Sequence, residues 1–339
     1  MEDKNLMKKL LAVILSLAVA CACAVPSFAA IKWDSLIPNQ GNSGKKNPQV
    51  ATAVAKPTNP DPAASTEPTT STVDVLVSGM FENIVRNLIL NRINQIRKEA
   101  YEEHLVSTYV PVQWSSDMEA IATQRAVESM MSANSTHTRT DGSVWYTADH
   151  DGVEPDGENL DWGRTAMDSI EYWYQSKQTY METQDAAQAG NYINLINPSY
   201  KYIGLRNFSV GEGTIRRCTC LEFSKADDLP TGPYGTAGTS TEQVTVLKKK
   251  LTYHLNGASS TAVGKRIRYE VVGYYADNDA DAYNGTFTVS LKDKPTWKSS
   301  NPSVATISED GILTALDAGT TTVSGTVNGK TVGKKVTVS

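Results

Sequence analysis

The fold of the C-terminal part of the chain is decided by the stretch TTVSGTVNGKTVGKKVTV, residues 321–338. Its two halves, 321–327 and 331–338, alternate and are rich in β-branched residues, which is typical of β-strands. Between them stands Asn328-Gly329, a dipeptide that favours a two-residue hairpin turn because both positions adopt positive φ. The stretch therefore predicts two neighbouring antiparallel strands.

The same pattern extends back to residue 243. Short strand-like runs are separated by Asn-Gly and Asp-Gly dipeptides, the turn signals that punctuate all-β domains. Residues 243–339 are therefore expected to form an all-β immunoglobulin-like sandwich. The runs are 245–253, 265–274, 285–292 and 305–307, and the dipeptides are Asn256-Gly257, Asn284-Gly285 and Asp310-Gly311.

Residues 76–228 show helical periodicity instead. Apolar residues three and four positions apart predict a first helix, and a capping box of Ser116 and Glu119 predicts the start of a second. A third helix is expected near Thr165, with Asp168 in its first turn. With two strand-like runs after these helices, the region is expected to be a mixed domain of helices packed on a small sheet. The runs are 202–208 and 214–223, and the first helix carries Phe81, Val85, Leu88, Ile89, Ile93 and Ile96.

Two stretches have the composition of connecting segments. Residues 30–75 are rich in Pro, Thr and Ser, and six of the 14 prolines lie between Pro38 and Pro68. Such a segment buries too little apolar surface to offset its ordering entropy, so we expect a disordered spacer. Residues 229–242, rich in Gly, Thr and Pro, are expected to be a linker.

The N-terminus has the pattern of an export signal. Lysines precede an apolar run at 10–25, and small residues before Ala29 favour cleavage, so residues 1–29 are predicted to be a signal peptide. A lipoprotein signal ending at Cys21 or Cys23, or an uncleaved anchor, are the alternatives. The protein is accordingly expected to be secreted or extracellular, and surface-associated if it is retained.

Charge and hydropathy exclude two classes of partner. The net charge is −5, whereas binding nucleic-acid phosphates requires a basic surface. No segment after the signal is apolar enough to span a bilayer.

After removal of the predicted signal the chain keeps two cysteines, Cys218 and Cys220, which are expected on one face of a strand. They are interpreted as half-buried thiols or as a structural bridge.

The C-terminal stretch from Trp297 to Ser339 resembles the bacterial Ig-like group 2 (BIG2) domain. The resemblance rests on SSNPSVATISEDGILTALDAGT and the closing VTV. It implies a surface module that serves as a spacer or adhesive element, with Trp297 and Val304 as core residues.

The middle region resembles the CAP superfamily, also called the SCP or pathogenesis-related type 1 domain. The matching motifs occur in the family's order and cover residues 76–228, and they imply an α-β-α sandwich. They are LNRINQIR, HTRTDG followed by VWY, GENLDWG, Trp173-Tyr174 and GNYINLINPSYKYIGL.

The family's pocket is formed by two His and two Glu, which bind zinc in some members. Carried over residue by residue, it becomes His137, Glu158, Ser176 and Asn191. A catalytic zinc needs three protein ligands, so the resemblance implies a pocket without a cofactor unless a further group completes it. The two groups considered are His150 and Glu182.

The remaining motifs favour no specific chemistry. His137 and Glu158 are the candidates for a general base pair, but the alternative, that they hold the cleft in shape, is favoured. No GxSxG, HExxH or Walker motif occurs. The acidic runs 149–156 and 277–281 are expected to be solvated loops and not calcium sites.

Two functions follow as hypotheses. The favoured one is a non-catalytic binding protein for a cell-wall or host surface component, displayed on the spacer and carried with the Ig-like module. The alternative is an extracellular hydrolase of peptide, glycan or lipid that uses His137 and Glu158, with or without zinc.

Overall fold

The computed structural model describes residues 54–55, 71–133, 136–211, 217–276 and 287–339. The predicted signal peptide, most of the spacer, the acidic run 277–281 and the turn Asn284-Gly285 lie outside these residues. Within the described residues, no helix combines the length and the apolar character needed to cross a membrane.

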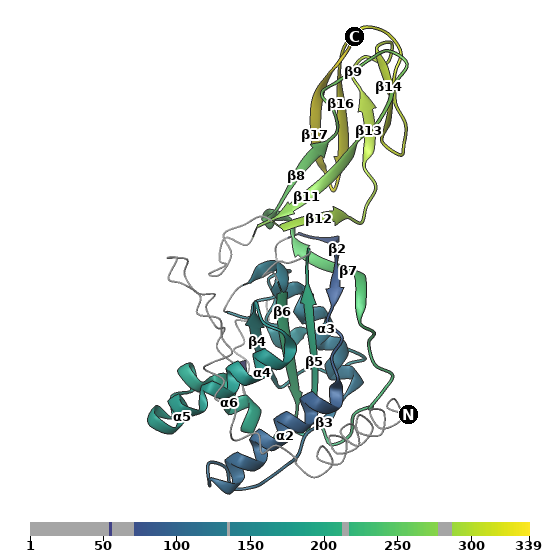
Figure 1. The fold of residues 1–339 in the computed structure, drawn as a ribbon. Coiled ribbons are helices and arrows are strands. Elements are labelled where there is room, and N and C mark those ends of the chain that lie inside the picture. The colour runs from purple at the N-terminus through teal and green to yellow at the C-terminus, as the bar shows by residue number, and fades with distance from the viewer. Residues whose placement is uncertain (1–53, 56–70, 134–135, 212–216, 277–286) are drawn as a thin grey trace, which may run out of the picture. The chain divides into compact units, whose positions relative to one another are not determined.

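A sheet forms the centre of the middle domain (Figure 1). Strands β4, β6, β5 and β2 lie side by side in that order, each antiparallel to its neighbour. β3 pairs in parallel with β5, and the two-residue β1 pairs with β4. The bounds are β1 Val54–Ala55, β2 Thr72–Phe81, β3 Gln113–Trp114, β4 Gly157–Trp162, β5 Tyr202–Ser209 and β6 Arg217–Ser224.

Helices cover both faces of this sheet, and every residue of β4 and β5 is therefore buried. On one face, Ala122 of α3 packs in a cluster with Leu160 and Cys220. On the other, Ile93 of α2 packs in a cluster with Leu221, to which α4 and α6 also contribute. The predicted α-β-α sandwich is confirmed. The helices are α2 Arg86–Glu102, α3 Ser116–Ser132, α4 Ala166–Gln175, α5 Lys177–Thr183 and α6 Ala186–Ile196.

The first helix starts later than its apolar pattern predicted. Phe81 is the last residue of β2, and Val85 and Leu88 are exposed. Of the predicted apolar residues, Ile89, Ile93 and Ile96 are the ones buried in the helix. The apolar residues of the predicted helix belong to two elements, the end of strand β2 and helix α2. Their spacing looked continuous because apolar positions of a strand and of a helix can fall in step over a few residues.

The second helix is capped one residue earlier than predicted. Ser115 is the N-cap of α3, and its hydroxyl accepts from the N–H groups of Asp117 and Met118. Glu119 makes no capping contact, and its carboxylate is buried among basic side chains. The third helix, α4, begins next to Thr165 as predicted, and the Thr165 side chain caps it by accepting from the Asp168 N–H.

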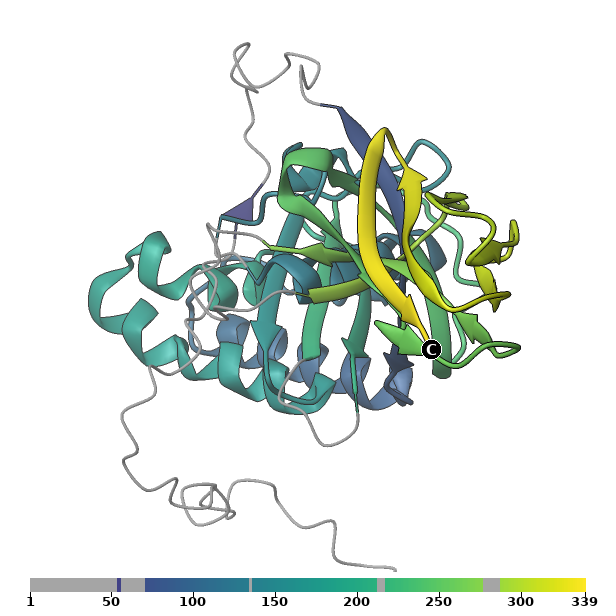
Figure 2. The same cartoon turned by 90° about the horizontal axis from the view of Figure 1, so that it is seen from above.

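The C-terminal part is all β, as predicted. Strands β16 and β17 form the expected hairpin, with Asn328 at φ 53° and Gly329 at φ 75° (yellow in Figure 2). Val304 is buried, and Trp297 packs partly buried against the same cluster. The strands are β8 Leu251–Asn256, β9 Ser260–Thr261, β10 Arg266–Arg268, β11 Glu270–Tyr275, β12 Phe287–Leu291, β13 Thr296–Ser299, β14 Ala305–Ile307, β15 Ile312–Ala315, β16 Gly319–Val327 and β17 Lys330–Val338.

Both predicted connecting segments contribute to a ladder. Strand β7, Gly238–Leu247, pairs with all ten residues of β2. Residues 72–75 of the predicted spacer and 238–242 of the predicted linker are therefore strand. Their Thr, Ser and Gly content suggested loops, but the segments alternate and satisfy one another's backbone groups.

Candidate functional site

Polar side chains gather on the face of β4 and β6 that lies beneath α3. The ladder places Glu158 opposite Glu222 and Leu160 opposite Cys220. Directly opposite residues of antiparallel strands share a face, and their Cβ atoms are about 5 Å apart. Both carboxyl groups are fully buried. A buried pair of like charges is unfavourable, so each carboxyl needs either a cation or a proton.

Arg125 of α3 supplies the cation. Its Nε donates to Glu158 Oε2 at 2.7 Å and its Nη2 to Oε1 at 3.0 Å, a two-point contact matched to a carboxylate. Burial acts to raise the pKa of Glu158, but the charge of Arg125 and the hydrogen bond with His137 outweigh it. The pKa of Glu158 therefore lies below its ordinary value.

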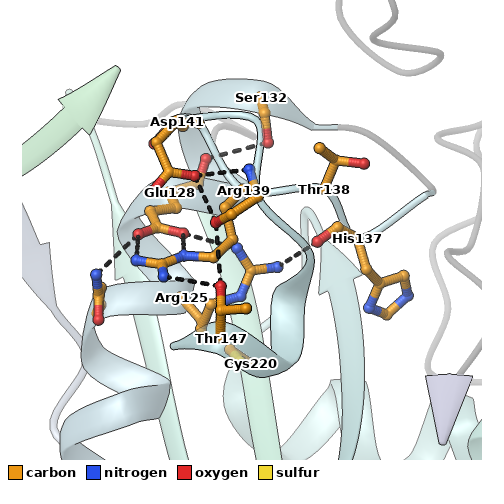
Figure 3. A network of polar contacts seen from close by, with 12 residues as sticks. Arg125, Glu128, Ser132, His137, Thr138, Arg139, Asp141, Thr147 and Cys220 are labelled. Atoms are coloured by element: carbon orange, nitrogen blue, oxygen red, sulfur yellow. Dashed lines mark hydrogen bonds and ion pairs between the residues drawn. The ribbon is translucent and has the colours of Figure 1, made fainter. Parts of the chain in front are cut away.

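His137 completes the contacts of Glu158. Its Nδ1 lies 2.5 Å from Glu158 Oε1, and its carbonyl accepts from Arg125 Nη2 at 3.0 Å. The residue adopts φ +62°, a left-handed conformation that is uncommon outside glycine and needs such anchoring. His137 is 1% exposed, and its buried Nε2 has no hydrogen-bond partner among the residues that the structure describes. In Figure 3 the imidazole points away from the Arg125–Glu128 contacts.

A second ion pair extends this cluster. Glu128 accepts from Arg125 Nη1 at 2.7 Å and from Arg139 Nη2 at 2.8 Å, and Arg139 also reaches Thr147 (Figure 3). Two guanidinium groups thus face two carboxylates, and the charges balance. The contacts tie the loop after α3 to the helix, so the position of His137 is set by the whole cluster.

Glu222 and Cys220 are held in their protonated forms. Burial raises the pKa of Glu222 well above its ordinary value, and the charge of Glu158 adds to this. Burial also raises the pKa of Cys220, whose Sγ lies 3.2 Å from Glu222 Oε1. This part of the face is therefore uncharged.

Sequence reasoning missed Arg125 and Glu222. A signal existed for each, since Glu222 follows Cys218 and Cys220 at steps of two and so shares their strand face. Arg125 occupies the apolar stripe of α3, four residues after Ile121. A charged residue at a core position needs a buried partner of opposite charge. Arg125 was therefore a candidate partner for a buried carboxylate, and Glu222 for a buried cation.

The other two pocket residues lie in or between helices of the domain. Ser176 is partly buried between α4 and α5. Asn191 is buried in α6, where its carbonyl accepts from Asn159 Nδ2 at 3.0 Å. Because Asn159 follows Glu158 on β4, its side chain points to the opposite face of the sheet. The structure therefore brings His137 and Glu158 together and places the Asn191 carbonyl on the other face.

The two groups considered as additional ligands make contacts elsewhere. His150 Nδ1 lies 3.0 Å from Asp117 Oδ1, with 45% of its side chain exposed. Glu182 is exposed on α5 and accepts from Gln178 at 2.9 Å. Asp149 caps a turn of its own loop through Gly152 N.

The donor set at Glu158 fits a zinc ion poorly. Both oxygens of Glu158 already accept hydrogen bonds from Arg125, whose guanidinium supplies the positive charge that a metal ion would supply. Ligand atoms of Glu158, Cys220 and Glu222 do lie within 4.8 Å of one another. A metal would nevertheless have to displace the protons that burial retains on Cys220 and Glu222 and compete with a guanidinium.

The cysteine pair is reduced. Cys218 and Cys220 are free and fully buried, so they are neither a bridge nor half-buried thiols. Burial raises the pKa of both, which keeps them in the unreactive thiol form.

Comparisons with known proteins agree with this architecture. Residues 90–213 match the CAP family, described as the cysteine-rich secretory protein family, and 280–338 match the bacterial Ig-like domain (group 2). No curated protein is significantly similar to the chain. A mutant intimin from EHEC O157:H7 is a solved structure with 15% identity and a TM-score of 0.18, covering 26% of this chain and 45% of its own length.

Proposed function

We propose that this chain, in which a CAP domain is followed by a bacterial Ig-like domain, is an exported protein that binds a cell-wall or host surface component without altering it chemically. The Ig-like domain acts as a spacer or adhesion module. The CAP domain supplies the binding surface, and it works without a cofactor.

The observation that carries the proposal is the burial of the candidate catalytic pair. A general base must come within hydrogen-bond reach of the proton that it removes. His137 is 1% and Glu158 0% exposed, and Arg125 occupies both oxygens of the carboxylate. Such an arrangement supports a structural role: the pair anchors the loop after α3 and shapes the surface above it.

A second candidate function is an extracellular hydrolase. One observation favours it: within the described part of the chain, His137 Nε2 has no hydrogen-bond partner, although Glu158 orients the ring through Nδ1. An imidazole held in this way has the arrangement of a general base, provided that local opening admits a substrate.

The two functions are separated by experiments on the full chain. Calorimetry with zinc compares wild type with His137→Asn, and turnover is measured on peptide, glycan and lipid ester substrates. Retention on insoluble peptidoglycan provides the binding assay. The binding proposal expects no sub-micromolar zinc site, no turnover in either protein and retention of both. Turnover that disappears in His137→Asn, with the fold intact by circular dichroism, would establish the hydrolase instead.

A further inference from the structure

Strand β1, which lies in the predicted N-terminal spacer, pairs with the backbone of Glu158, the central carboxylate of the candidate site. Val54 pairs with Glu158 and Ala55 with Gly157, in antiparallel register. The small purple arrow beside the sheet in Figure 2 is this strand. Glu158 thus holds Arg125 and His137 through its side chain, while its backbone lies against the chain's own N-terminal segment.

The sequence explains why this part of the spacer forms a strand. Residues 50–55 read VATAVA, in which β-branched residues at 50, 52 and 54 alternate with alanines. This pattern suits a strand, whereas Pro, Asn, Thr and Ser dominate the flanking segments. Pro57 stands two residues after Ala55, and a proline is disfavoured within a strand because it lacks an N–H.

The edge of β4 is suited to a short peptide. An edge strand presents backbone N–H and C=O groups that pair with any extended chain, so the main chain supplies the affinity. Further along β4, the indole of Trp173 donates to the Leu160 carbonyl at 3.4 Å. Because that carbonyl already accepts a hydrogen bond, a docked strand pairs only with the part of the edge near Gly157 and Glu158.

We propose that the β4 edge at Gly157 and Glu158 is a docking site for extended peptides, and that β1, Val54–Ala55 of this chain, occupies it in cis. An incoming peptide with the same alternation of alanine and β-branched residues displaces the segment. Because β1 belongs to the same chain as β4, it competes with any incoming peptide at an effective concentration on the order of 1 mM. The inference is independent of the proposed function, since it does not require any role of His137.

The test uses the full chain and a fluorescein-labelled peptide, PQVATAVAK, which copies residues 48–56. Val54→Pro removes a ladder N–H, and Ala64→Pro makes the same change elsewhere in the spacer as the control. Fluorescence anisotropy measures peptide affinity, and hydrogen exchange measures protection of residues 157–159. We expect Val54→Pro to bind the peptide about tenfold more tightly than wild type and Ala64→Pro, which is the change produced by removing a competitor near 1 mM whose own Kd is about 0.1 mM. Exchange at 157–159 should be faster in Val54→Pro and slow again when peptide is added.

Two results would overturn the inference. The first is equal exchange at 157–159 in all three proteins together with no peptide binding to Val54→Pro. The second is a wild-type dimer, detected by sedimentation, that Val54→Pro abolishes, because the segment would then dock on a second copy and not in cis.

Discussion

At the scale of single residues, the site is held by the pairing of buried charges. Arg125 contacts Glu158 and Glu128, and each of the three side chains is at most 3% exposed. A buried ion pair adds little net stability when both partners are present, because both must be desolvated. Losing one partner is costly, since the other charge stays buried without compensation.

Arg125→Met is therefore expected to destabilise the protein by about 3–5 kcal/mol. The matched control is Arg92→Met, because Arg92 pairs with Glu171 at 2.6 Å but both side chains are partly exposed, at 19% and 32%. That change should cost about 1 kcal/mol or less. Urea denaturation of both variants measures the difference. Equal losses would contradict a buried charge cluster.

Glu222 makes the stability depend on pH. Because its pKa is raised in the folded state, the unfolded chain releases this proton above the ordinary value of 4.5 while the folded chain keeps it. Stability is then lost as pH rises from 4.5 towards the folded pKa, by up to about 1.4 kcal/mol per pH unit. Glu222→Gln imitates the protonated form and should remove this slope, whereas exposed Glu182→Gln should not. Denaturation between about pH 5 and pH 8 distinguishes them; a slope retained by Glu222→Gln would show that another group titrates.

At the scale of elements, the start of α3 is set by Ser115 and not by the predicted capping box. Ser115→Ala should cost about 1 kcal/mol, because the N–H groups of Asp117 and Met118 lose their acceptor. Ser116→Ala is the control; its hydroxyl reaches only the Pro230 carbonyl at 3.2 Å, in an exposed position. Thermal or urea unfolding should rank the two in that order, and the reverse order would restore Ser116 as the cap.

The packing of α3 on the sheet depends on a close approach at Gly204 of β5. A Cβ at this position would lie 2.0 Å from Glu119 N and 2.2 Å from Met118 C, both backbone atoms of the helix. Gly204→Ala must therefore push α3 away, at a cost of about 3 kcal/mol or more. Gly333→Ala is the control, since the nearest atom, Thr322 Cγ2, is 3.4 Å away and the change should cost about 0.5 kcal/mol. Similar unfolding midpoints for the two variants would contradict this packing.

At the scale of the whole molecule, one buried carboxylate fixes the segment that was predicted to be a linker. Glu119 accepts from Arg86 and Trp114 at 2.7 Å, and from Arg206 and the Gly235 N–H at 3.1 Å. Arg86 in turn donates to the Gly235 carbonyl at 2.7 Å. The path into β7 is therefore ordered by hydrogen bonds even though its composition is that of a loop.

Glu119→Gln is expected to loosen this segment, because an amide replaces a charged acceptor among two guanidinium groups. Limited proteolysis should cut residues 229–238 at least about tenfold faster than in wild type, which corresponds to about 1.5 kcal/mol of local stability. Exposed Glu102→Gln serves as the control, and mass spectrometry locates the cuts. An unchanged cleavage rate would mean that the β2–β7 ladder alone holds the segment.

Some features followed from local pattern alone. The hairpin of β16 and β17 was predictable because its alternation and its Asn-Gly turn lie within one short stretch. The same is true of α4, whose cap and first turn are local. The match of His137 to Glu158 came from motif order in the CAP resemblance, and the structure brings the two within 2.5 Å.

The sequence by itself thus determined the fold classes of the two regions and the pair at the centre of the site, because short-range periodicity and motif order encode them. Only the tertiary structure decided that Arg125 neutralises Glu158, that Glu222 keeps its proton, that Ser115 caps α3 and that residues 54–55 pair with β4. Each of these depends on burial and on partners, and most of those partners are brought together only by folding. Desolvation then requires the charges and backbone groups to be satisfied by whatever lies nearest in space.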